Sequence, residues 1–136
     1  DGQDICKRAV AGMVGASNQV LDDMGLSVAD IDLVVPHQAN SRIIDAVGRK
    51  LGVSTNRIFV NVERYGNMSA ATVLVALVEA IEQGYLQASS KILLPAFGAG
   101  LTWNSHLVIS RNSLELRQDP CYYCFLEHLV MFSMQR

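Results

Sequence analysis

Three short segments of the chain place polar side chains or bare backbone where chemistry could occur. Residues 36–40 contain His37, residues 66–69 contain Asn67, and residues 97–100 read Phe-Gly-Ala-Gly. Each segment follows a predicted strand, and α/β folds build their sites at the carboxyl ends of strands. We therefore expect the three segments to converge, and their coincidence is more informative than any one of them.

His37 and Asn67 are the candidates for hydrogen-bond donors in that crevice. His37 follows an apolar strand and Pro36, and Asn67 lies between Gly66 and a predicted helix. An imidazole can donate from one ring nitrogen while a neighbour fixes its tautomer. Two structural alternatives stay open at this point: a histidine that satisfies a buried carbonyl, and an asparagine that caps the helix after it.

The other two candidate features are a glycine-bearing turn and a basic helix face. In residues 97–100, exposed backbone N–H groups could stabilise an oxyanion, although a tight β-turn explains the same sequence. Arg42 and Arg49 are seven residues apart and share a helix face, with Lys50 beside them. Such a strip could bind phosphates, or it could be an ordinary solvated face.

The cysteines predict neither a disulfide framework nor a metal site. The chain has three of them, Cys6, Cys121 and Cys124. An odd count, with two of the three only three positions apart, does not indicate a disulfide framework, so a reducing, cytosolic compartment is the default expectation. Cys121, Cys124 and His128 offer three ligands, fewer than the four usual for structural zinc, so no metal is expected. Cys6 is predicted to be a small, buried residue of the first helix.

The elements that must position these residues alternate between helix and strand. Hydrophobic periodicity predicts helices over 5–24, 41–51 and about 69–83, and strands over 31–35, 57–62, 91–95 and 101–109. This alternation favours an α/β fold with layered helices and a mixed, largely parallel sheet. Residues 111–136 have no clear period. We interpret residues 1–110 as the domain and 111–136 as a tail.

Composition bounds the class of protein. Half of the 136 residues are hydrophobic and 18% are charged, which excludes disorder, collagen and low complexity. The net charge of −2 does not support bulk attraction to nucleic acid or to anionic lipid. No signal peptide is visible, the longest apolar stretch (70–81) is too short to span a bilayer, and the absence of an initial Met suggests a processed chain or a fragment.

The hydrophobicity is high for so short a chain and suggests surfaces that the chain does not cover alone. The helix at 69–83 is apolar almost all round, which predicts burial on every side. We expect this helix and both faces of the sheet to require a further partner.

Four segments, in order and with matching spacing, resemble the C-terminal half of β-ketoacyl-acyl-carrier-protein synthase III, the enzyme that starts type II fatty acid synthesis. They read Val-Pro-His-Gln-Ala-Asn at 35–40, Arg-Ile-Ile-Asp at 42–45, Arg-Tyr-Gly-Asn-Met-Ser-Ala-Ala at 64–71 and Ala-Phe-Gly-Ala-Gly-Leu-Thr-Trp at 96–103. The resemblance covers about residues 1–109. It implies one half of a thiolase-like fold and an acyltransferase that condenses malonyl-acyl-carrier-protein with an acyl-CoA primer, with loss of CO₂.

The resemblance implies that His37 and Asn67 are two members of a Cys-His-Asn triad. Loss of CO₂ leaves an enolate, whose oxygen two fixed donors would stabilise, and a dry site would keep the imidazole neutral. The nucleophilic Cys of the family belongs to its N-terminal half, and no cysteine of this chain occupies a matching position. The backbone N–H of Ala99 matches one oxyanion donor of the cysteine step.

The same match extends to the binding of substrate. It implies that Asn40 contacts the pantetheine arm and that Phe97 forms a wall of the acyl pocket. Arg42, Arg49 and Lys50 match the basic helix that docks the acidic carrier protein, where opposite charge steers association. The family usually has Thr where this chain has Met68, so we expect perturbed hydrogen bonding of Asn67.

Partners and location follow from the resemblance. It implies acyl carrier protein, CoA thioesters and a homodimer, with no cofactor beyond the thioester substrates and neither nucleic acid nor membrane as a partner. The expected location is the bacterial cytoplasm, or the plastid stroma in a eukaryote. Two alternatives stay open: a related condensing enzyme of secondary metabolism, and a non-catalytic module that docks the carrier protein. Without the Cys, this chain alone should not condense.

Overall fold

The fold combines four helices with a four-stranded sheet in the part of the chain that the structure, a computed structural model, describes: residues 2–110 and 129–133. The helices are α1 (Gly2–Asp23), α2 (Ser41–Leu51), α3 (Val62–Tyr65) and α4 (Ala71–Glu82). The strands are β1 (Leu33–Val34), β2 (Lys91–Gly98), β3 (Thr102–Ser110) and β4 (Leu129–Ser133). Short 3-10 turns cover Val28–Asp30 and Thr55–Arg57. The α/β class is confirmed.

The sheet is mixed, with strand order β1-β2-β3-β4. β1 pairs with β2 in parallel, whereas β2–β3 and β3–β4 are antiparallel. The expectation of a mostly parallel sheet is therefore wrong for the described residues. The reason is the turn at 99–101, which returns β2 directly into β3 and so requires antiparallel pairing.

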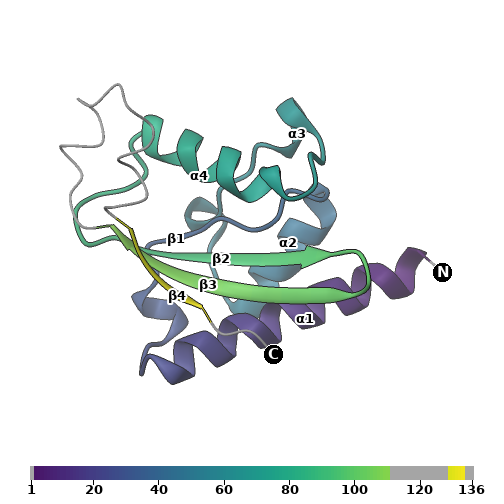
Figure 1. The fold of residues 1–136 in the computed structure, drawn as a ribbon, viewed down its shortest axis with the longest axis horizontal. Coiled ribbons are helices and arrows are strands. Elements are labelled where there is room, and N and C mark those ends of the chain that lie inside the picture. The colour runs from purple at the N-terminus through teal and green to yellow at the C-terminus, as the bar shows by residue number, and fades with distance from the viewer. Residues whose placement is uncertain (1, 111–128, 134–136) are drawn as a thin grey trace.

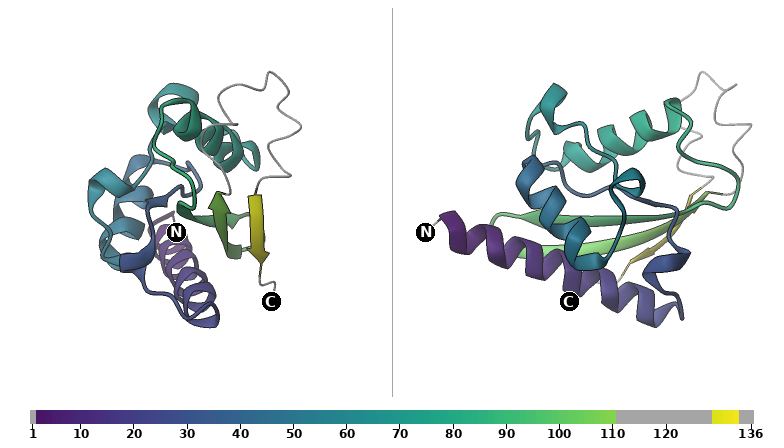
Figure 2. Two further views of the ribbon diagram at one scale, coloured as in Figure 1. Left: turned by 90° about the vertical axis from the view of Figure 1, so that its left-hand side faces the viewer. Right: turned by 180° about the vertical axis from the view of Figure 1, so that it is seen from behind.

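Helices cover both faces of the sheet, as Figures 1 and 2 show. α1 and α2 lie on one face, and α4 lies on the other. Alternate strand residues supply two separate cores, as the pleat requires. Val34, Leu93 and Leu107 pack with α1 and α2, while their strand neighbours Ile92 and Leu94 pack with α4. The expectation that both faces of the sheet need a further partner is thus wrong for these strand residues, because helices of this chain cover them.

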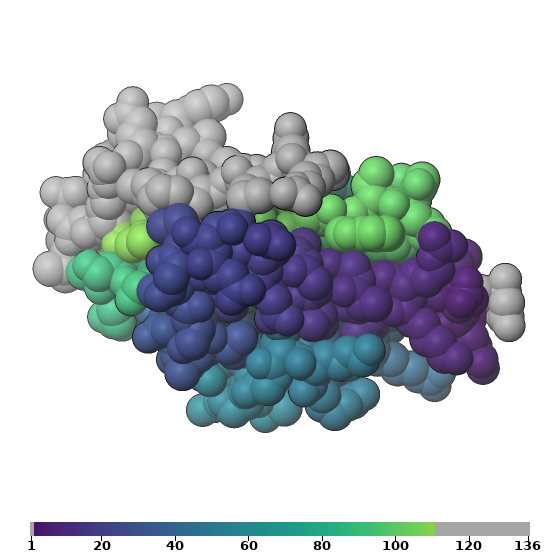
Figure 3. Space-filling view, turned by 90° about the horizontal axis from the view of Figure 1, so that it is seen from below, coloured from purple at the N-terminus to yellow at the C-terminus, as the bar shows by residue number. Residues whose placement is uncertain are grey.

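α1 forms the outer layer on its side of the molecule. Figure 3 shows it extending along this face, with the α2 region on one flank. The spacing of Val10, Met13, Val14, Ser17 and Leu21 predicts one buried face, and the structure confirms it: Val14 is partly buried and the other four are buried. Cys6 is only partly buried and packs at the edge of the same core.

Residues 57–62 do not form the predicted strand. A single bridge joins Val34 to Ile58, after which the chain turns into α3. The side chain of Gln38 explains why strand pairing does not continue past Ile58. Its Oε1 accepts hydrogen bonds from the backbone N–H groups of Asn61 (2.9 Å) and Val62 (3.2 Å). Both donors are therefore occupied by a side chain instead of a strand partner.

α4 is not buried on every side. Its inner face, with Ala76, Leu77 and Ala80, packs on the sheet, but Leu74 on the outer face is 62% exposed. Nothing else in the described residues covers that outer face. The apolar character of α4 therefore exceeds what this sheet buries.

Candidate active site

His37 lies where the chain leaves β1, and the backbone fixes its position. The parallel ladder continues past β1, since Val35 N–H donates to Leu93 O (2.9 Å) and His37 N–H donates to Pro95 O (2.8 Å). The His37 residue is only 8% exposed. Burial lowers the pKa of the imidazole, because desolvation disfavours the charged form. The ring is therefore neutral at pH 7, as the expected role requires.

A hydroxyl group holds one nitrogen of the ring. His37 Nδ1 lies 2.6 Å from Thr72 Oγ1, at the start of α4. The partner is thus not a buried carbonyl, which was the structural alternative for this histidine. No hydrogen bond joins Nε2 to any other described residue, so Nε2 is the nitrogen left for a ligand.

Asn67 lies in the loop between α3 and α4, and the loop determines which end of its amide is available. Its Oδ1 accepts a hydrogen bond from Ser69 N–H (2.9 Å), which leaves Nδ2 as the donor. Left-handed backbone at Gly66 (φ +67°) and Ser69 (φ +58°) shapes this turn. The alternative that Asn67 caps α4 is wrong, because the residue that precedes α4 is Ala70, which makes no side-chain cap.

Thr72 and Ser69 connect the two candidate residues. Thr72 Oγ1 donates to Ser69 O (2.9 Å), while the N–H of the same Ser69 donates to Asn67. A hydrogen-bonded chain therefore extends from His37 through Thr72 and Ser69 to Asn67. The structure thus connects the loop at 36–40 with the loop at 66–69, as the sequence predicted. Only the loop at 36–40 follows a strand in the fold, because residues 57–62 form none.

A buried glutamine next to His37 anchors its loop. Gln38 is 1% exposed, and its Nε2 donates to Pro36 O (2.8 Å) and Phe59 O (3.2 Å). Its Oε1 accepts from the backbone at the start of α3, as described above. One side chain thus ties residues 36–38 to the segment that leads to Asn67.

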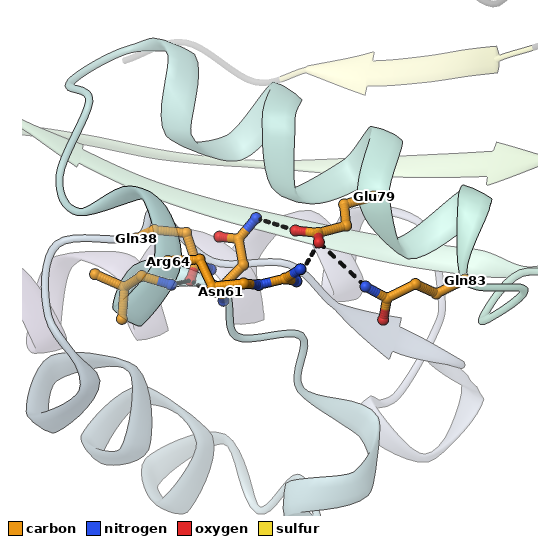
Figure 4. A network of polar contacts seen from close by, with 6 residues as sticks. Gln38, Asn61, Arg64, Glu79 and Gln83 are labelled. Carbon is orange, nitrogen blue, oxygen red and sulfur yellow. Dashed lines mark hydrogen bonds and ion pairs between the residues drawn. The ribbon is translucent and has the colours of Figure 1, made fainter.

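Glu79 holds the other side of that segment, as Figure 4 shows. Asn61 Nδ2 donates to Glu79 Oε2 (2.7 Å), and Gln83 Nε2 donates to Oε1 (3.1 Å). Arg64 of α3 forms an ion pair with the same carboxylate. The carboxylate therefore links α3 to α4 on both sides of the Asn67 loop.

Sequence reasoning missed these supporting residues. Gln38 stands in the motif at 35–40, where no role was assigned to it, and Thr72 and Asn61 lie outside the four motifs. Glu79 did leave a signal, because it is a lone carboxylate within the apolar stretch 70–81, and a buried charge requires polar partners.

Phe97 and Ala99 lie at the end of β2, with Ala99 exposed in the turn to β3. Gly100 (φ +93°) and Leu101 (φ +41°) take up the left-handed backbone of this turn, whereas the φ of Ala99 is not positive. A Cβ is therefore tolerated at Ala99. Phe97 packs at the edge of the core on the α1 face, while His37 is hydrogen-bonded to Thr72 of α4.

Asn40 caps α2. Its Oδ1 accepts from Ile43 N–H (3.0 Å), which leaves the amide NH₂ free of the cap. Arg42, Arg49 and Lys50 are all exposed on α2, opposite its buried face. None of the three forms an ion pair with another described residue. The basic strip is thus open to solvent, with Arg42 in the first turn of α2 and Arg49 and Lys50 in its last turn.

Other kinds of site are not evident within the described ranges. There, no three residues of the types His, Cys, Asp and Glu gather as a metal site would require. In the same ranges, no helix has the length and apolar character needed to cross a membrane. An open hollow of about 330 Å³ lies between α1 and Trp103, and none of the candidate residues lines it. Cys121, Cys124 and His128 lie outside the described residues.

Comparison with known proteins gives a consistent result. The family model described as 3-oxoacyl-[acyl-carrier-protein (ACP)] synthase III C terminal matches residues 21–109. Beta-ketoacyl-[acyl-carrier-protein] synthase III 2 of Vibrio vulnificus (strain YJ016) is 53% identical over 107 residues, which are 79% of this chain and 30% of that protein. The chain therefore spans about a third of the length of the curated relatives it matches.

Solved structures with the same fold include two condensing enzymes. The 3-oxoacyl-[acyl-carrier-protein] synthase III of Aquifex aeolicus VF5 is 42% identical with a TM-score of 0.77, over 79% of this chain and 35% of that one. The priming β-ketosynthase of the R1128 polyketide biosynthetic pathway is 36% identical with a TM-score of 0.75, over 83% and 34%. This chain belongs to the family of the 3-oxoacyl-[acyl-carrier-protein] synthase III C-terminal part, and its fold is thiolase-like.

Proposed function

We propose that this chain supplies the His and Asn part of the condensation site of a β-ketoacyl-acyl-carrier-protein synthase III. The observation that carries the proposal is the hydrogen-bonded chain from His37 through Thr72 and Ser69 to Asn67. That chain occupies Nδ1 of the imidazole and Oδ1 of the amide. It leaves Nε2 of His37 and Nδ2 of Asn67 for one substrate oxygen.

The chemistry places negative charge on that oxygen. A malonyl thioester on the carrier protein loses CO₂, and the electron pair of the broken C–C bond forms an enolate. The enolate carbon then attacks the acyl thioester carried by a cysteine, and the cysteine thiolate leaves. Each fixed donor to such an oxyanion contributes about 10²–10³ in rate. The cysteine of this reaction would come from the additional length that the relatives possess.

Decarboxylation can be tested on this chain without the cysteine. The experiment measures single-turnover CO₂ release from malonyl-acyl-carrier-protein, and we expect release above the uncatalysed rate. Asn67→Ala should lower that release by about 10²-fold, because one oxyanion donor is lost. The matched control is Asn56→Ala, an exposed asparagine outside the site. Equal release from the two variants would refute the proposed role of Asn67.

Docking of the carrier protein is the second part of the proposal. The support is the exposed basic strip of Arg42, Arg49 and Lys50, since opposite charge steers an acidic partner. In a titration of labelled carrier protein, the pair Arg49→Ala/Lys50→Ala should weaken binding and its salt dependence. The matched control is Lys7→Ala/Arg8→Ala, two exposed charges of α1. Equal loss in both pairs would mean that only net charge matters.

These two measurements separate the alternative functions. Binding that depends on Arg49 and Lys50, without any CO₂ release, would favour a non-catalytic docking module. The other candidate function is that of a condensing enzyme of secondary metabolism. The likeness to the R1128 priming β-ketosynthase supports keeping this alternative. Preference among acyl-CoA primers, measured on the longest chain that the gene encodes, would discriminate it. A homodimer, the absence of a further cofactor and a cytoplasmic location belong to the same proposal.

A further inference from the structure

Thr72 occupies an unusual position between two hydrogen-bond partners. It is fully buried, and its Oγ1 lies 2.6 Å from His37 Nδ1 and 2.9 Å from Ser69 O. A hydroxyl group has a single proton to donate and two lone pairs that accept. A carbonyl oxygen can only accept, so the hydroxyl proton points either at Ser69 O or at His37 Nδ1. Its direction determines which nitrogen of the neutral ring carries the ring proton.

Only two arrangements satisfy the contact between Thr72 and the neutral ring. In the first, the hydroxyl donates to Ser69 O, so His37 must carry its proton on Nδ1 and donate it to Oγ1. In the second, the hydroxyl donates to a bare Nδ1, and the ring proton lies on Nε2. A bare Nδ1 facing a hydroxyl that points at Ser69 is excluded, because two lone pairs would then meet at 2.6 Å.

The first arrangement makes one more hydrogen bond than the second. The hydroxyl both accepts from Nδ1–H and donates to Ser69 O, whereas in the second arrangement it makes a single bond to the ring. Ser69 O retains the N–H of Thr72 (3.2 Å) in both. One additional hydrogen bond favours the first arrangement by about fivefold, from the usual net contribution of such a bond.

We propose that Thr72 is a positioning residue that sets the tautomer of His37, with the proton on Nδ1 and a bare Nε2 in the ligand-free protein. The histidine then presents a hydrogen-bond acceptor at rest. When a thioester oxygen binds and needs a donor, rotation of the Thr72 hydroxyl from Ser69 O to Nδ1 stabilises the other neutral tautomer. The proton leaves Nδ1 and a proton arrives at Nε2 through solvent, so the net charge of the ring does not change.

The change of tautomer on binding of a thioester oxygen rests on the proposed function, whereas the tautomer of the ligand-free chain does not. The tautomer is a property of the ligand-free chain and is read without any turnover. Failure of CO₂ release would therefore overturn the proposed function while leaving the resting tautomer as it is measured. Conversely, a wrong tautomer would leave a positive release assay intact.

The test is nitrogen NMR of the imidazole of His37 in the full 136-residue chain, at a pH where the ring is neutral. Long-range proton–nitrogen spectra distinguish a protonated ring nitrogen from a bare one. We expect a protonated Nδ1 and a bare Nε2 in the unaltered chain. A proton found mainly on Nε2 would overturn the proposal directly, with no variant needed.

Two variants then test the cause. Thr72→Val keeps the shape and removes the hydroxyl, so His37 should shift to the Nε2–H tautomer, because Nδ1–H would have no acceptor. Thr72→Ser keeps a hydroxyl and should restore the original pattern. His106, on β3, is the internal control whose spectrum should not respond. An unchanged His37 pattern in a folded Thr72→Val chain would refute the role of Thr72.

Discussion

Glu79 is the residue whose removal tests the architecture of the site most sharply. It is 8% exposed, and Asn61 Nδ2, Gln83 Nε2 and Arg64 all donate to its carboxylate. Glu79→Gln preserves the shape but replaces one acceptor oxygen with an NH₂ group. That NH₂ must then face a donor, and Asn61, which is only 3% exposed, cannot turn to water instead.

The expected loss can be worked from these contacts. Hydrogen bonds to a charged group contribute about 1.5–3 kcal/mol each, and one of them is lost in the variant. The Arg64 side chain is 55% exposed, so its ion pair adds little, about 0.5 kcal/mol after screening. We therefore expect Glu79→Gln to lower the free energy of unfolding by about 2–3.5 kcal/mol.

Urea unfolding followed by far-UV circular dichroism measures this loss. The matched control is Glu63→Gln, which removes one exposed carboxylate of α3 and should change stability by about 0.5 kcal/mol or less. If the two variants unfold at the same urea concentration, the buried network does not stabilise the fold as argued. Arg64→Ala should fall between them.

Two further predictions concern the core and the titration of the site. Burial lowers the pKa of His37 from its usual 6.5, so the unfolded chain binds the proton first as pH falls. Stability should then decrease below about pH 7, and His37→Gln should abolish that part of the dependence in urea unfolding across pH. A methyl at Gly12 would lie 2.5 Å from the Trp103 ring, so Gly12→Ala should displace the ring, shift the fluorescence of this single tryptophan and lower stability by about 1–3 kcal/mol. Gly48→Ala meets only the flexible end of Ile58 and should lower stability less; the reverse order would refute this reasoning.

Periodicity predicted the helices well because their buried residues are local in sequence. α1 and α2 bury one face each, and the spacing of Met13, Ser17 and Leu21 shows that face directly. The strand predicted over 57–62 failed for a non-local reason. Its N–H groups at Asn61 and Val62 are taken by Gln38, a residue more than 20 positions earlier, and no pattern within the segment records that contact.

The burial of α4 illustrates the same limit. Its composition correctly indicated a helix that packs on a sheet, but composition could not say which face would be covered. Leu77 is buried and Leu74 is exposed, three positions earlier on the same helix. Only the placement of the sheet distinguishes the two leucines.

By itself, the sequence determined the identity of the candidate residues and the family, because His37, Asn67 and the turn at 97–100 stand in ordered motifs. It also determined the α/β class through the alternation of periods. The tertiary structure alone decided which atoms of those residues are available. Burial keeps the imidazole neutral, and the hydroxyl of Thr72, on a distant part of the chain, occupies Nδ1 of the ring. Only the contact on Oδ1 of Asn67 is local, since it comes from the N–H of Ser69. Hydrogen bonds between distant segments depend on how layers stack, which the order of residues does not express.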